Sequence, residues 1–329
     1  HRCRNTDRGA LPGRSRGTER RRPPSLSKQL SSRARLLREA RHFFESRGYL
    51  ETETPTLVPS PGVDFHLDAF ETNGPPGARY LITSPEYQMK RLLADGQRRI
   101  YQLVRAYRRD DKGERHNPEF TILEFYRAPS TVDEIMADTE QLVAKLTRGS
   151  VTLGDQRIQT LPPFARLRVA EAFRRYASVE EDAMLDWARN DPDRYYETLA
   201  FTIEPALAEL PYALFLEDYP AEMASLARKK PTDPRYAERF ELYVGGVELC
   251  NGFGELTDPG EQRARFDADR SERAAAGKPM YPIDEAFLAA LAKGLPPCAG
   301  NAIGFDRLAA LCCGTKEIAE VIAFTADEL

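Results

Sequence analysis

The chain has 329 residues, of which 41% are hydrophobic and 30% charged, and its formal net charge is −4. This composition is ordinary for a soluble globular protein and leaves room for one large domain or two small ones. No apolar run approaches the length of a membrane span, and the overall acidity gives no footprint of a nucleic-acid-binding protein. Five cysteines without a CxxC pair, together with only four histidines, favour a reduced cytoplasmic protein over a disulfide or zinc framework.

The first 24 residues differ from the rest of the chain. They hold eight Arg against Asp7 and Glu19, a balance of +6, so the remaining residues carry −10. This segment has Gly and Pro but almost no apolar side chains, so it cannot bury enough surface to fold. We expect a disordered basic tail over residues 1–25, without a catalytic role, and a folded domain over residues 26–329. A nucleic-acid-binding arm and a start-site artefact are the alternatives for the tail.

A helix is expected over residues 31–47. Apolar residues from Leu36 to Phe44 recur there at helical spacing, and Gly48 follows as a stop signal. The next segment favours extended chain, and Pro55 excludes a helix through it. A long helix followed by such a strand is typical of a packing edge, so residues 35–55 are a candidate contact between subunits.

The next helix begins at Ser84-Pro85-Glu86 and ends at Gly96. Ser84 suits the N-cap position and Pro85 suits the first helical position. Capping alone is the commoner use of such residues, so Ser84 and Glu86 do not by themselves indicate a site.

Two buried strands, over residues 100–107 and 120–126, enclose an unusually charged loop. Its ionisable residues are Arg108, Arg109, Asp110, Asp111, Lys112, Glu114, Arg115, His116 and Glu119. Arg suits bidentate contacts with phosphate, and the ring of Phe120 suits stacking on a base. From this stretch alone, a polyanion clamp and a solvated loop are equally supported.

The middle of the chain is less informative. Thr131 and Glu134 predict a capping box for a helix that runs to about Leu146. Residues 150–205 are interpreted as a helical and irregular insertion without a chemical role.

A hairpin follows from Arg239. Its first strand alternates through Phe240 and Val244, Gly245-Gly246 forms the turn, and the return strand starts at Val247. Glu248 and Glu255 lie in or next to the apolar return strand, where carboxylates are costly unless paired with a cation or metal. Two carboxylates suit Mg²⁺, which is commonly shared with substrate phosphates. The alternative is that both side chains face solvent.

The last segment joins a strand of small residues, 299–304, to a helix that carries Arg307. Asp306 is expected to cap this helix. The P-loop pattern GxxxxGK is absent, which disfavours a Walker-type NTPase. An Arg on the first turn of a helix behind a Gly-rich strand can still meet a phosphate.

Together these stretches resemble the class II aminoacyl-tRNA synthetases. Residues 48–64 are similar to their motif 1 with Pro55 as its proline, residues 101–127 to motif 2, and GNAIGFDRL to motif 3. TSPEYQMKRLL, HNPEFT and RFELYVGGVELCNGFGELTDP are most similar to the lysyl-tRNA synthetase branch. The resemblance covers roughly residues 26–329 and implies an α+β domain with a mostly antiparallel sheet flanked by helices. It also implies a homodimer through residues 35–55.

Within that branch the chain looks most like the elongation factor P β-lysine ligases. Only about 25 residues precede the first helix, too few for the anticodon-binding OB domain of lysyl-tRNA synthetases. Ala302 stands where the synthetases carry Gly. The resemblance implies ATP-dependent activation of (R)-β-lysine or lysine as an aminoacyl-adenylate, with Mg²⁺, and transfer to a lysine ε-amine of elongation factor P. A tRNA-charging paralogue and a non-catalytic regulatory paralogue are the alternatives, although tRNA is not the expected partner.

The family's roles carry over onto matching positions. For ATP these are Arg108, Arg109, Asp110, His116, Asn117, Phe120, Glu248, Leu249, Gly304 and Arg307, with Arg108 and Arg307 as the catalytic pair. For the amino acid they are Ser84, Pro85, Glu86, Tyr126, Asn251, Glu255 and Ala302. Glu248 and Glu255 match the carboxylates that hold Mg²⁺. The chain departs from the family at Arg108-Arg109-Asp110, where Arg-Asn-Glu is usual, and at Gly254, where relatives carry a larger polar residue.

Overall fold

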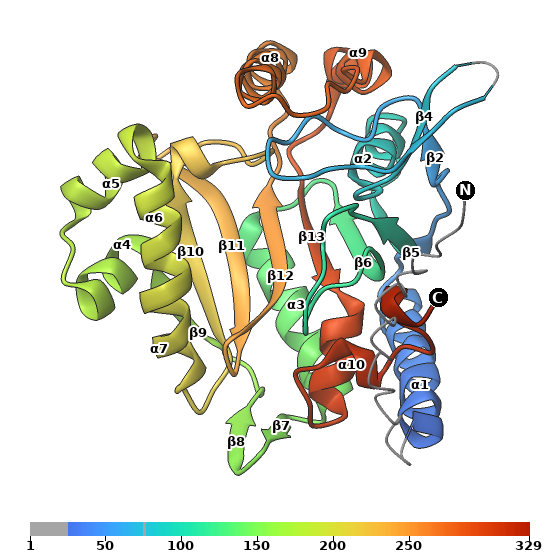
Figure 1. Ribbon diagram of the computed structural model, residues 1–329, viewed down its shortest axis with the longest axis vertical. Helices are drawn as coiled ribbons and strands as arrows, with labels where there is room; N and C mark the ends of the chain where they lie inside the picture. The colour runs from blue at the N-terminus through green and yellow to red at the C-terminus, as the bar shows by residue number, and fades with distance from the viewer. Residues whose placement is uncertain (1–25, 75–76) are drawn as a thin grey trace, which may run out of the picture.

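A computed structural model describes residues 26–74 and 77–329 (Figure 1). The basic tail predicted for residues 1–25 lies outside the described residues. The main element is a sheet of eight strands in the order β1-β5-β6-β13-β12-β11-β10-β9. Its pairs are antiparallel except at the two edges, where β1 runs parallel to β5 and β9 parallel to β10. The predicted α+β fold with a mostly antiparallel sheet is confirmed.

The strands of this sheet come from most of the chain. They are β1 (Leu50–Glu51), β5 (Arg99–Tyr107), β6 (Glu119–Arg127), β9 (Ala165–Arg168), β10 (Leu214–Pro220), β11 (Tyr236–Val244), β12 (Val247–Gly254) and β13 (Ala299–Gly304). A smaller sheet combines β2 (Leu57–Val58), β4 (Arg79–Leu81) and β3 (Glu71–Thr72), and a hairpin combines β7 (Ser150–Leu153) with β8 (Gln156–Gln159).

Two sets of helices cover the two faces of the sheet. On one face, α1 (Leu26–Glu45), α3 (Val132–Thr147) and α10 (Phe305–Cys312) enclose the largest apolar core with Leu123 and Phe125 of β6. On the other, α2 (Glu86–Ala94), α8 (Pro259–Ala275) and α9 (Glu285–Gly294) form a second core with Tyr126. Since residues 123 and 125 alternate with residue 126, the two cores lie on opposite faces of β6.

Local signals account for several element ends. The side chain of Thr131 accepts from the backbone N–H of Glu134, and that of Glu134 accepts from the N–H of Thr131, so the predicted capping box is confirmed. The Oγ of Ser84 accepts from the N–H of Glu86, although α2 begins at Glu86 rather than at Pro85. Gly245 and Gly246 both have positive φ, 58° and 73°, as the tight turn between β11 and β12 requires.

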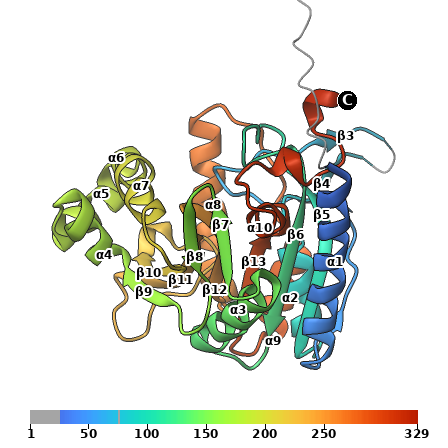
Figure 2. The same ribbon diagram turned by 90° about the horizontal axis from the view of Figure 1, so that it is seen from below.

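The interpretation of residues 150–205 as helical was wrong in its first part. Residues 150–168 form β7, β8 and β9, and β9 extends the main sheet. Val151, Leu153 and Ile158 are buried at alternate positions, but strands of four residues give only a weak two-residue period. The helices begin at Val169: α4 (Val169–Ala172), α5 (Glu181–Asn190), α6 (Pro192–Thr198) and α7 (Glu204–Ala208). Figure 2 shows α4 to α7 grouped at the end of the molecule away from α1.

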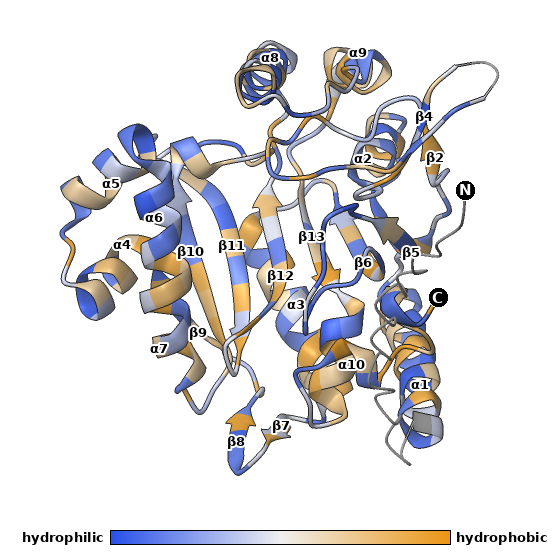
Figure 3. Cartoon of the chain, in the orientation of Figure 1, coloured by the Kyte–Doolittle hydropathy of each residue, from blue (hydrophilic) through white to orange (hydrophobic). Residues whose placement is uncertain are grey.

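Hydrophilic residues occur on many helices and loops (Figure 3). Figure 3 shows hydrophilic residues along β11 and in the loop between β5 and β6.

Among the described residues, none of the helices is long and apolar enough to cross a membrane. The homodimer through residues 35–55 stays a prediction. Leu50 lies in that region with 54% of its surface exposed.

Candidate active site

One large cavity of about 780 Å³ opens on the sheet face that carries α2 and α8. Ala302 of β13 and Asn251 of β12 line its floor. Strand pairing puts both on one face of the sheet with the buried Glu124 of β6, because the three are cross-strand neighbours. Of the residues predicted for ATP and the amino acid, the cavity brings together Ser84, Glu86, Arg108, His116, Asn117, Phe120, Glu248, Leu249, Asn251, Ala302, Gly304 and Arg307.

One end of the cavity is rich in cations. Arg307 donates from Nη1 to the backbone oxygen of Glu248 at 2.8 Å, and its Nη2 lies 2.7 Å from Nε2 of His116. Arg108 comes from the end of β5, and its guanidinium lies 5.0 Å from the ring centre of Phe120. Arg115 lines the same end and donates to the backbone oxygen of Gly246 at 2.8 Å. Three guanidinium groups in one hollow suit a polyphosphate.

His116 is held neutral at this end. Burial lowers the pKa of His116, and the positive charge of Arg307 lowers it further. A neutral imidazole accepts a hydrogen bond on Nε2 while the arginine donates. His116 therefore fixes the orientation of Arg307 without adding a positive charge.

The side chains of Arg109 and Asp110 do not line the cavity, although both were predicted to bind ATP. They lie in the exposed part of the loop, and Arg109 donates to Asp110 at 3.4 Å. The acid that lines the cavity is the next one, Asp111, which lies 3.7 Å from Arg108. A loop has no fixed side-chain period, so the sequence does not show which of three consecutive residues points inward.

Two long-range contacts hold the cationic end in place. Arg33 of α1 forms a buried ion pair with Asp306 at 2.5 Å, and Asp306 also accepts from the N–H of Thr121 at 2.7 Å. The prediction that Asp306 caps α10 was wrong, because α10 has no side-chain cap. Its carboxylate instead contacts Arg33 of α1 and Thr121 of β6. The loop of β5 and β6 is tied to the C-terminal segment, since the N–H of Ile318 donates to the oxygen of Glu114.

The other end of the cavity is built from carboxylates. Glu86 lines the cavity, and the Nζ of Lys90 lies 2.5 Å from its carboxylate. The same Nζ lies 2.5 Å from Glu255, whose side chain is only 1% exposed. Glu124 is also buried; it accepts from the hydroxyl of Tyr126 at 2.5 Å and from Ser84 at 2.8 Å. Tyr126 and Glu255 thus lie behind the surface formed by Ser84 and Glu86.

Charge in this cluster is nearly balanced by the protein itself. Burial and the charge of Glu86 raise the pKa of Glu124 to about 8, which favours the protonated form of this carboxyl. Burial raises the pKa of Glu255 to about 7, against the attraction of Lys90. Although burial opposes it, the carboxylates of Glu255 and Glu86 raise the pKa of Lys90. A ligand ammonium placed here would find carboxylate acceptors on several sides.

The pair of carboxylates predicted for Mg²⁺ is not assembled. Glu248 lines the cavity beside Arg307, but Glu255 does not line it and is ion-paired with Lys90. A divalent cation at Glu255 would have to displace this ammonium from a buried site. No group of three or more His, Cys, Asp or Glu in residues 26–74 and 77–329 could hold a metal by itself. Of the two predicted metal ligands, Glu248 is the one that lines the cavity, where a carboxylate can share a cation with substrate phosphates.

Three residues at or next to the site were not predicted to belong to it: Lys90, Glu124 and Asp111. Lys90 lies four residues after Glu86 in α2, so the two share a helix face. Glu124 lies two residues before Tyr126 in a strand, which also places the two on one face. Both spacings are visible in the sequence. The departure at Gly254 has a packing reason, because a Cβ there would collide with the side chain of Glu238.

Residues 14–328 match the family model described as tRNA synthetases class II (D, K and N). The chain belongs to this family. Its relatives include the elongation factor P–(R)-β-lysine ligase of Salmonella dublin, 41% identical over 93% of this chain and 97% of that protein. The enzyme of the same name from Klebsiella pneumoniae is 40% identical over the same shares. The comparisons confirm the resemblance inferred from the motifs.

Proposed function

We propose that this class II family member activates (R)-β-lysine, or lysine, with ATP and transfers the aminoacyl group to a lysine ε-amine of elongation factor P. One observation carries the proposal: a single cavity joins three arginines at one end to Glu86 and the buried Glu124–Lys90–Glu255 cluster at the other. ATP suits the first end. A small molecule with a carboxylate and two ammonium groups suits the space between them.

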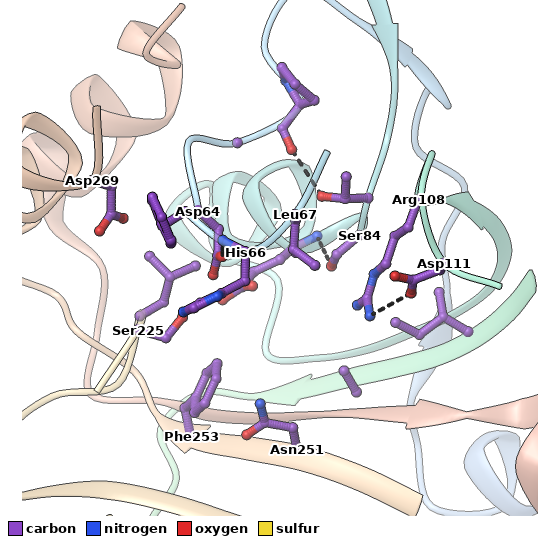
Figure 4. Close-up of a pocket in the computed structure, with 18 of the residues that line it drawn as sticks. Asp64, His66, Leu67, Ser84, Arg108, Asp111, Ser225, Asn251, Phe253 and Asp269 are labelled. Carbon is purple, nitrogen blue, oxygen red and sulfur yellow. Dashed lines mark hydrogen bonds and ion pairs between the residues drawn. The ribbon is translucent and has the colours of Figure 1, made fainter. Parts of the chain in front are cut away.

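The roles of the residues follow from their places. Arg108 lies at the cationic end, and Figure 4 shows Ser84 between it and Asp64. Its role is to neutralise both the amino-acid carboxylate and the α-phosphate. The carboxylate attacks the α-phosphorus, the bond to the β-phosphate oxygen breaks, and pyrophosphate leaves. Arg307 neutralises the phosphates, and Phe120 offers a face for the adenine. Positioning and charge neutralisation carry this step, with no protein nucleophile.

Mg²⁺ belongs to the same proposal, with Glu248 as the carboxylate nearest the phosphate end. When bound with ATP, the ion neutralises phosphate charge and orients the leaving group. Glu255 has a different proposed role: with Lys90 it completes the recognition of the substrate amine. A cytoplasmic location also belongs to the proposal, since a translation factor is the acceptor.

Mass spectrometry of elongation factor P tests the proposal. Purified factor is incubated with the enzyme, ATP and either (R)-β-lysine or α-lysine. We expect the mass of one lysine residue to be added on one lysine side chain, faster with (R)-β-lysine, and not at all without ATP. Lysine tRNA in a parallel reaction serves as the competing acceptor. Acylation of the tRNA with an unmodified factor would favour the tRNA-charging alternative, and absence of amino-acid-dependent pyrophosphate exchange would favour the regulatory one.

A further inference from the structure

A third part of the cavity is used neither by ATP nor by the amino acid in the proposed function. It is lined by four carboxylates, which we call the acidic arm: Asp64, Asp193, Asp269 and Glu272. Figure 4 shows Asp64 and Asp269 on the side of the cavity away from Arg108, with Ser84 between them and the arginine. The arm is therefore continuous with the site where an adenylate would form.

The carboxylates of the acidic arm have no ion-pair partner in the described part of the chain. Three arginines also line this region, but each has a carboxylate of its own. Arg189 pairs with Glu222 at 2.9 Å, Arg239 with Glu241 at 2.7 Å, and Arg265 with Glu261 at 2.6 Å. The local excess of charge is thus negative, unlike the charge of the phosphate end.

A buried amide gives an independent indication of a ligand. Gln262 is 0% exposed, lines the cavity, and lies seven residues before Asp269, so both are on one face of α8. Neither Oε1 nor Nε2 of Gln262 has a hydrogen-bond partner among the described residues. Buried amides are normally satisfied, so this side chain points to a polar group that is supplied from outside the chain.

Within the acidic arm, Asp269 has a pKa that is raised to near neutral pH. Burial, followed by the negative charges of Asp64 and Glu272, raises the pKa of Asp269 to about 7. Arg265 and Arg273 oppose the shift, but Arg273 is committed to Asp68 at 2.5 Å. From α2, the neighbouring phenol of Tyr87 adds no positive charge. An incoming cation would lower the pKa of Asp269 and convert the pair with Asp64 into two carboxylate acceptors.

We infer that the acidic arm receives the acceptor: a lysine side chain of the protein substrate enters past Asp64 and Asp269, which bind its ammonium group, while Gln262 accepts or donates a hydrogen bond. This inference rests on the proposed function. It assigns residues to the transfer step that play no part in adenylate formation. Before it reacts, the ammonium releases one proton to solvent. The free amine nitrogen then attacks the acyl carbonyl, the new C–N bond forms, the bond from the carbonyl carbon to the phosphate oxygen of AMP breaks, and AMP leaves while the nitrogen releases its second proton to solvent.

Asp269→Asn and Asp64→Asn in the full chain test the inference. We expect KM for elongation factor P to rise about tenfold in each variant, because a partly buried charge pair is lost. Amino-acid-dependent pyrophosphate exchange should stay within about twofold of wild type. Asp267→Asn is the matched control, since Asp267 is on the same helix but exposed and outside the cavity. Asp269→Glu should restore most of the wild-type KM.

A pH series separates binding from a structural role. In wild type, KM for the acceptor should fall as pH rises from 6 to 8, as Asp269 ionises, and this dependence should flatten in Asp269→Asn. An unchanged KM in both variants would overturn the inference. So would an equal loss of pyrophosphate exchange and transfer, which would place these residues at the amino-acid site.

A small probe tests the arm apart from the proposed function. Nα-acetyl-lysine amide presents the same ammonium group, and its binding can be followed by calorimetry at millimolar concentration. Wild type should bind it about tenfold more tightly than Asp269→Asn, whether or not the chain acylates elongation factor P. Equal binding of the probe by wild type and Asp269→Asn would contradict the inference that the acidic arm binds an ammonium group. A wild type that binds the probe but activates no amino acid would contradict only the proposed function.

Discussion

The two ends of the cavity differ in how far their charged side chains are exposed and in what compensates the charge. At the phosphate end, the side chains of Arg108 and Arg307 are 28% and 18% exposed, and Arg307 is steadied largely by backbone oxygens. Water and ligand can both reach these charges. At the carboxylate end, Lys90 is fully buried and Glu255 nearly so. Charge that water cannot reach must be compensated inside the protein, and Lys90 and the proton on Glu124 do so.

This difference indicates what each end selects. An end that leaves its cations available binds polyanions strongly and shows little preference for shape. An end whose carboxylates are already neutralised by Lys90 and by a proton binds only a group that interacts with those carboxylates more favourably than the proton does. An ammonium at the right place can do this, because it allows Glu124 to ionise. We therefore expect the phosphate end to set the rate of activation and the carboxylate end to set the choice of amino acid.

Loss of Lys90 should have the largest effect. Lys90→Met leaves two carboxylates in a buried site without their cation, which typically costs about 3–5 kcal/mol. Thermal unfolding should show a large fall in Tm. The double variant with Glu255→Gln removes the uncompensated charge and should recover much of the loss. A small effect of Lys90→Met alone would mean that the carboxylate end is wetter than its burial indicates.

Removal of either catalytic arginine should come next. Arg108→Ala and Arg307→Ala should each lower the rate of pyrophosphate exchange about a hundredfold, or about 3 kcal/mol in the transition state, while the fold is retained. Arg109→Ala is the matched control in the same loop and should behave like wild type, because its side chain lies outside the cavity. A near-normal rate for Arg307→Ala would remove that residue from the mechanism.

Ala302 tests the choice of amino acid with a smaller change. Its methyl group lies in the row between Glu124 and Asn251, on the cavity floor. Ala302→Gly should shift preference from (R)-β-lysine toward α-lysine by roughly ten- to two-hundredfold, the range for one methyl group in a pocket. The ratio of the two kcat/KM values measures this. An unchanged ratio with lower stability would show that Ala302 only packs the strand.

The smallest expected effect is the release of a proton from Glu124 when the amino acid binds. Glu124, with a pKa of about 8 when the site is empty, should lose its proton when a substrate ammonium binds beside it. Affinity for the amino acid should therefore rise with pH up to about 8, at most tenfold per unit. Calorimetry in two buffers of different ionisation enthalpy should detect up to one proton released at pH 7 in wild type and none from this group in Glu124→Gln. Equal heats in the two buffers for wild type would contradict the assignment.

The sequence was most informative where a motif fixes both residue and spacing. Arg108, Phe120 and Arg307 were predicted and do line one cavity, because Phe120 and Arg307 have fixed positions in β6 and α10 and Arg108 directly follows β5. Arg109 and Asp110 were also predicted to bind ATP but do not line the cavity, and a loop gives the sequence no such period. Glu255 was assigned to a metal because the sequence does not show that a lysine from another element lies against it. Contacts of this kind depend on packing between distant segments.

The contact between Arg33 and Asp306 also concerns the order of synthesis. Glu86, Lys90 and Glu124 emerge from the ribosome well before α10 does, and the loop of β5 and β6 is fastened only when Ile318 has been made. A chain that ended before residue 305 would contain Glu86, Lys90 and Glu124 but lack Arg307. Such a chain would also lack Asp306, and with it the contacts to Arg33 and to the N–H of Thr121 that join α1 and β6 at the cationic end.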